Sequence, residues 1–220
     1  MLTKYENEFN EIRRSIKGLS DVIVKAYLLG LEGFQDRDPA KLDESKSILK
    51  NIDVKTNEVD NKIIKIFALF EPEASLLREL VALLKTTNEL SRIASGGKNY
   101  AKNMKKHIEE GISFEGIEDH MIEIHRAAIN ALASATDIEK DTEEYEKKYA
   151  NTIVEENKTD ELFAILEKEI LKRVCNKEGA LENYINILNI VRKFERVADH
   201  SVNIAKMFLY AKKGGKIEVY

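Results

Sequence analysis

The sequence predicts an all-α protein of six long helices, arranged as two tandem antiparallel three-helix bundles. Two prolines and ten glycines among 220 residues are too few for the many turns of a β-sandwich or barrel. Apolar residues recur at spacings of three and four over most of the chain, which is the period of an amphipathic helix. Three long helical patterns followed by a break occur twice, which indicates an internal repeat.

The first three helices are bounded by recognisable start and stop signals. An apolar stripe that begins at Phe9 ends at Phe34. Asp38 followed by Pro39 is typical of an N-cap with proline at the first helical position. Pro72 ends the next pattern, because proline cannot continue a hydrogen-bonded helical turn. These signals predict helices over about residues 9–34, 39–67 and 73–107.

The second half begins after a short linker at residues 111–116, which contains two glycines. Further apolar stripes follow it, and the last two are separated by a break at residues 176–179. We expect residues 214–220 to be frayed or extended. The predicted helices of this half cover about residues 115–138, 142–174 and 181–212.

Sliding the chain along itself by 104 residues supports the duplication. Arg92-Ile93-Ala94 then falls on Arg196-Val197-Ala198, and the hydrophobic phase is kept although few residues are identical. We therefore predict two three-helix units, residues 1–110 and 111–220. Because the connections are short, consecutive helices should pack antiparallel.

Composition excludes several function classes. A net charge of −4 does not favour binding to nucleic acid. The single cysteine, Cys175, cannot form an internal disulfide, and no apolar run approaches the 18 residues of a membrane span. The first residues are charged where a signal peptide would be apolar. We therefore expect a cytoplasmic protein without a membrane span.

Four carboxylates occupy a core-facing phase of the last two predicted helices. Glu195 and Asp199 lie one turn apart on the last helix, and Glu156 and Asp160 do so on the helix before it. Neighbouring antiparallel helices would bring the two pairs together. Buried carboxylates are costly and repel one another, so they must be protonated, paired with basic residues or bound to cations.

The residues alone leave the choice between these states open. Arg192 and Arg196 are near enough in sequence to form an ion-pair network, and the spacing by itself favours such a network or a polar groove over a metal site. If a cation does bind, a set of oxygen ligands suits Mg, Mn, Ca or Fe.

The histidines do not support a ferritin-like di-metal enzyme, because the sequence contains no Glu-x-x-His motif. His120 and His125 are expected on a polar helix face rather than as ligands. His200 follows Asp199. We expect it either to contact a metal ligand without binding the metal itself or to be solvated.

The last helix contains a segment that resembles a known family. Residues 194–205 read FERVADHSVNIA, which closely resembles the Glu-Arg-Ile-Gly-Asp-His-x-x-Asn-Ile-Ala segment of the PhoU family. Residues 68–73 and the following Leu77-Arg78 resemble that family's hinge between the second and third helices. Residues 156–162 resemble its acidic motif. The resemblance extends over nearly the whole chain.

The resemblance implies a six-helix, non-catalytic, cytoplasmic regulator that forms homodimers. Family members act negatively on the phosphate-starvation response and are thought to couple the ATPase subunit of a phosphate ABC transporter to a sensor histidine kinase. They reach the inner face of the membrane only through such partners. Their acidic motifs bind multinuclear metal clusters. The alternative is a helical adaptor for a phosphate transporter or sodium–phosphate symporter, in which the acidic pairs are only structural ion-pair networks.

Carried over to this chain, the resemblance assigns the metal ligands to the second half only. They are Glu156, Asp160, Glu195 and Asp199. The metal is expected to be divalent or trivalent, with iron first and Mn, Zn or Mg as alternatives. The first half keeps one of the four corresponding carboxylates, and we therefore predict one site rather than two. Its corresponding residues are Leu49, Asp53, Ser91 and Ser95.

Overall fold

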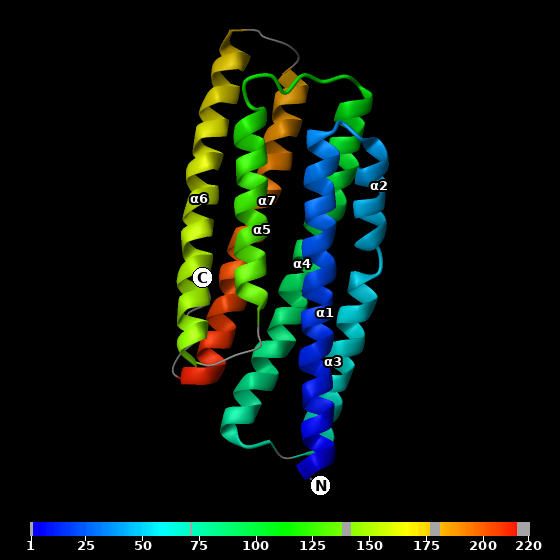
Figure 1. Ribbon diagram of the computed structural model, residues 1–220, viewed down its shortest axis with the longest axis vertical. Coiled ribbons are helices and arrows are strands. Elements are labelled where there is room, and N and C mark those ends of the chain that lie inside the picture. The colour runs from blue at the N-terminus through cyan, green and yellow to red at the C-terminus, as the bar shows by residue number, and fades with distance from the viewer. Residues whose placement is uncertain (1, 71, 138–141, 177–180, 215–220) are drawn as a thin grey trace.

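The computed structural model describes residues 2–70, 72–137, 142–176 and 181–214, and it confirms the all-α class (Figure 1). All regular structure within these residues is helical. The helices are α1 (Leu2–Gln35), α2 (Pro39–Ile48), α3 (Ile52–Leu69), α4 (Ala74–Glu109), α5 (Glu118–Thr136), α6 (Thr142–Cys175) and α7 (Leu181–Lys213). The predicted tail lies almost wholly outside the described residues.

The helix predicted from residue 39 to 67 is wrong in one respect, because it is interrupted between α2 and α3. A turn at residues 49–51 separates the two segments. Leu49 and Ile52 on either side are both buried. Apolar periodicity therefore continues across the interruption and does not reveal it. Asn51 stands at the junction as the N-cap residue of α3, although its side chain makes no capping hydrogen bond.

The start of α2 follows the predicted capping pattern. The Asp38 carboxylate accepts hydrogen bonds from the backbone N–H of Ala40 at 2.8 Å and of Lys41 at 3.4 Å. Pro39 occupies the first turn, where its missing N–H costs nothing. Arg37 has a left-handed backbone, with φ of 54°, and this residue reverses the chain after α1.

The helices lie along the long axis of the molecule, with successive long helices antiparallel (Figure 1). Helices α1 to α4 occupy one side and α5 to α7 the other. The two sides meet where α4 packs against α7 and where α1 packs against α5. None of the described helices is long and apolar enough to cross a membrane.

An aromatic cluster joins the two sides of the core. The ring of Phe194 lies 4.8 Å from that of Tyr100 and 4.1 Å from that of His125, between centroids. Tyr27 approaches His125 edge-on at 5.9 Å and donates a hydrogen bond to the Ile93 carbonyl at 2.8 Å. These contacts tie α1 and α4 to α5 and α7.

The expectation that His125 lies on a polar face is wrong. Only 1% of this residue is exposed. Burial lowers the pKa of its imidazole to about 3, because the charged form would lose its hydration. His125 therefore serves as a neutral aromatic residue of the core. His120, by contrast, is half-buried, and its Nδ1 lies 3.1 Å from a Glu169 carboxylate oxygen.

Candidate metal centre

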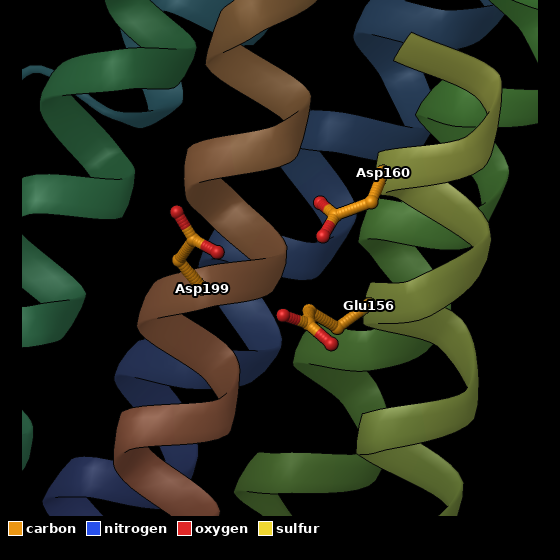
Figure 2. A group of neighbouring side chains, drawn as sticks. All are labelled: Glu156, Asp160 and Asp199. Carbon is orange, nitrogen blue, oxygen red and sulfur yellow. The ribbon is translucent and has the colours of Figure 1, made fainter. Parts of the chain in front are cut away.

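Three of the four predicted ligands converge between α6 and α7. Glu156 and Asp160 lie one turn apart on α6 and point toward α7, which carries Asp199 (Figure 2). One carboxylate oxygen from each residue lies within 4.8 Å of the others. Packing of α6 against α7 therefore brings Asp199 to two carboxylates that precede it by 39 and 43 positions in the sequence.

Glu195 lies beside this group rather than within it. It precedes Asp199 by one turn of α7 and is half-buried. Burial and the negative charges of Asp199 and Asp160 raise the pKa of Glu195. Glu195 thus experiences the field of the cluster without belonging to the set of oxygens that lie close together.

The cluster is electrostatically unfavourable by itself. Burial and the charges of Asp160 and Asp199 raise the pKa of Glu156. Asp199 is exposed as a whole residue, but partial loss of hydration at the helix contact and the charge of Asp160 raise the pKa of its carboxyl group. In the part of the chain that the structure describes, no lysine, arginine or histidine forms a salt bridge with these carboxylates. Arg192, one expected partner, lies over the Phe163 ring with its guanidinium carbon 5.4 Å from the centroid.

The core-facing placement predicted for these carboxylates needs correction. Asp160 and Asp199 are exposed, while Glu156 and Glu195 are half-buried. Helical phase fixes the direction of a side chain but not how closely the neighbouring helices cover it. At this position the polar atoms lie at the edge of the contact between α6 and α7, where solvent and ions reach them.

This donor set fits a hard or borderline cation. Carboxylate oxygens are the preferred ligands of Mg²⁺, Ca²⁺ and Mn²⁺, and they also bind iron. A cation would offset the lost hydration and the mutual repulsion that together raise the pKa values of Glu156 and Asp199. Among the described residues no thiolate or imidazole joins the group.

A neighbouring pair was missed by the sequence analysis. His200 Nδ1 lies 2.5 Å from a carboxylate oxygen of Glu89 on α4. Glu89 is only 7% exposed and lies between the buried residues Thr86 and Ile93 in helical spacing. The same argument that singled out Glu195, an acid in an apolar stripe, would have found Glu89.

The corresponding place in the first half contains a lysine. Lys98 Nζ lies 2.8 Å from one oxygen of Asp53, and Ser91 Oγ donates a hydrogen bond at 2.8 Å to the other. The Lys98 hydrogen bond, together with that from Ser91, holds the pKa of Asp53 below its ordinary value. Leu49, in the position that matches Glu156, is fully buried. The one retained carboxylate is therefore already neutralised.

A protein-family model and several known proteins match this chain. The PhoU domain model matches residues 16–104 and again residues 118–208. A "phosphate-specific transport system accessory protein PhoU homolog" of Pseudomonas aeruginosa is 23% identical over 214 residues, covering 96% of this chain and 86% of that protein. A protein of the same description from Streptococcus pneumoniae is 21% identical over 224 residues and covers both chains completely.

Two crystal structures have the same architecture. The "phosphate transport system regulatory protein PhoU" of Streptococcus pneumoniae superposes with a TM-score of 0.84 at 18% identity, covering 98% of this chain and 100% of that one. PhoU of Pseudomonas aeruginosa gives a TM-score of 0.80 at 21% identity, covering 96% and 100%. Since the family model covers most of the sequence in two matches, the chain belongs to the PhoU family.

Proposed function

We propose that this protein is a non-catalytic accessory regulator of phosphate uptake. It couples a phosphate transporter, through the ATPase subunit, to a sensor histidine kinase, and it restrains the phosphate-starvation response from the cytoplasmic side as a homodimer. The observation that carries the proposal is the double match to the PhoU domain over residues 16–104 and 118–208. The names of its relatives, accessory and regulatory proteins of phosphate transport, support the same role.

A metal site in the second half is part of this proposal. Glu156, Asp160 and Asp199 hold the cation, and Glu195, one turn before Asp199, lies in the electric field of the same cluster. Iron is the first candidate, and Mn, Zn or Mg are the alternatives. When bound, the metal supplies positive charge that cancels the repulsion among these carboxylates.

The second candidate is a helical adaptor in which the acidic pairs are structural ion-pair networks. The absence of salt bridges to the four carboxylates, among the described residues, counts against it. So do the raised pKa values of Glu156, Glu195 and Asp199, because carboxylates in ion pairs have lowered ones.

Elemental analysis tests the metal site. Protein purified without chelator is compared with the variant Glu156→Gln/Asp160→Asn/Asp199→Asn. The control removes three exposed carboxylates elsewhere, by Glu58→Gln/Glu161→Gln/Glu182→Gln. We expect bound metal in the wild type and the control and its loss in the cluster variant. Equal metal in all three proteins would refute the site.

Reconstitution tests the regulatory role. The purified chain is mixed with the phosphate-transporter ATPase subunit and with the sensor kinase of the same organism, and complexes are detected by size-exclusion chromatography with light scattering. We expect the protein to bind both. The proposed coupling of transporter to kinase is wrong if the protein binds neither partner, both in the presence of metal and after chelation. This conclusion holds whatever the outcome of the elemental analysis.

A further inference from the structure

A pocket of about 510 Å³ opens between α4 and α7, on the α4 side of Asp199. Its polar lining comes from both helices: Arg92, Ser95 and Asn99 from α4, and Lys193, Arg196 and Asp199 from α7. His200 also reaches the pocket while bonded to Glu89. We propose that this pocket binds a phosphate group, supplied as inorganic phosphate or as a phosphate ester.

The charge of the lining supports an anionic ligand. Arg92, Lys193 and Arg196 face one carboxylate in the wall, that of Asp199, and none of the three cations forms a salt bridge with any residue that the structure describes. Like charges held together repel one another, and a bound anion relieves that repulsion. The protein as a whole has a net charge of −4, so this excess of positive charge is local.

The two arginines occupy equivalent positions of the duplicated sequence. Arg92 and Arg196 are separated by 104 residues, and the two matches to the PhoU domain end at residues 104 and 208, separated by the same interval. Helices α4 and α7 pack against each other and run antiparallel (Figure 1). Equivalent positions therefore meet across one contact, and each of the two helices contributes one arginine to the lining of the pocket.

That arrangement matches the shape of a phosphate group. A guanidinium presents a planar fork of N–H donors that binds two oxygens of a phosphate at once. Two forks from opposite sides can each take one edge of the tetrahedron. Lys193 adds a point charge, and Ser95 and Asn99 add neutral donors at the rim.

The pocket does not depend on the proposed metal, and its test uses protein treated with chelator. Inorganic phosphate and ATP are titrated separately by calorimetry at constant ionic strength. The variant Arg92→Gln/Arg196→Gln is compared with Arg14→Gln/Arg126→Gln, which removes two exposed arginines outside the pocket. All four arginines are exposed, and circular dichroism verifies that both variants are folded.

We expect the pocket variant to lose at least about tenfold in affinity for phosphate, because charge-assisted hydrogen bonds are lost, while the control keeps it. Binding of ATP that needs the same two arginines, without binding of inorganic phosphate, supports the proposal and identifies an ester as the source. The proposal is overturned if wild-type protein binds neither ligand, or if both variants bind equally.

Discussion

Nδ1 of His200 lies 2.5 Å from Oε2 of Glu89, and this contact fastens α7 to α4 next to Asp199. Glu89 is almost completely buried, and its carboxylate depends on this partner. The candidate metal centre on α6 and α7 is therefore physically connected to a helix of the first half. A change in the position of Asp199 would act directly on the contact between the two halves.

Replacing His200 by alanine should destabilise the protein by about 1–3 kcal/mol, because the Glu89 carboxylate remains buried without its hydrogen-bond partner. Urea unfolding followed by circular dichroism measures the loss. The double variant Glu89→Leu/His200→Ala should recover part of it, since no buried charge is then left unpaired. If the single variant is as stable as the wild type, the contact between Glu89 and His200 does not stabilise the fold.

Substitution by alanine should change the stability in opposite directions at the adjacent glycines of α4, Gly96 and Gly97. At Gly97 a Cβ would lie 2.7 Å from Leu49 Cδ1 and 2.9 Å from Tyr27 Cε2, so Gly97→Ala should cost about 1–3 kcal/mol. At Gly96 the nearest atom is 3.5 Å away, and Gly96→Ala should gain up to about 1 kcal/mol through helix propensity. Thermal unfolding of both variants checks the signs. A stabilising Gly97→Ala would contradict the close packing of α4 on Leu49 and Tyr27.

His125 should contribute to acid sensitivity. Its pKa is about 3 in the folded protein against an ordinary 6.5, so between these values the unfolded chain binds the extra proton. Stability due to this residue is complete above pH 6.5 and falls as the pH decreases toward 3, by about 1.4 kcal/mol per pH unit. Urea midpoints between pH 4 and 7 should fall less steeply for His125→Phe than for the wild type. Identical slopes would show that His125 is protonated in the folded state.

Without bound metal, the carboxylate cluster should make the folded protein less stable as the pH rises, which is the opposite of the pH dependence due to His125. The pKa values of Glu156 and Asp199 are raised in the folded protein, so their ionised forms cost stability once the pH rises above those values. Because solvent screens these groups, the chelated variant Glu156→Gln/Asp160→Asn/Asp199→Asn should gain only about 0.5–1 kcal/mol at pH 7. The gain should become smaller as the pH falls, because Glu156 and Asp199 take up protons more readily in the folded protein than in the unfolded chain. Chemical unfolding at pH 7 and at lower pH measures it.

Bound metal should make the wild type more stable than the cluster variant. Addition of Mn²⁺ should raise the melting temperature of the wild type, because a ligand that binds only the folded state stabilises it by mass action. The cluster variant should not respond. The separate variant Glu195→Gln should respond with reduced affinity if Glu195 joins the ligands, and with unchanged affinity if three carboxylates suffice.

The sequence predicted the helices and their caps well because these depend on local spacing. The Asp38 cap and the stripe beginning at Phe9 are examples, and both are visible in a few consecutive residues. The turn at residues 49–51 was hidden because Leu49 and Ile52 keep the apolar phase across it.

Contacts between distant segments were harder to predict. Three of four proposed ligands come together, yet their exposure depends on how α6 and α7 are covered, which no single-helix pattern contains. His125 was misplaced for the same reason, since the rings that bury it come from α1, α4 and α7. The pocket of Arg92 and Arg196 required the antiparallel contact between α4 and α7.

Lys98 makes the two halves of the molecule differ in how their acidic groups are neutralised. Its ammonium group belongs to the chain and lies 2.8 Å from an oxygen of Asp53. The carboxylates of α6 and α7 form no salt bridge with a lysine, arginine or histidine among the described residues. The counter-charge of the first half is therefore supplied by the fold, while full neutralisation of the acidic group in the second half would need a cation from solution, as the proposed site requires.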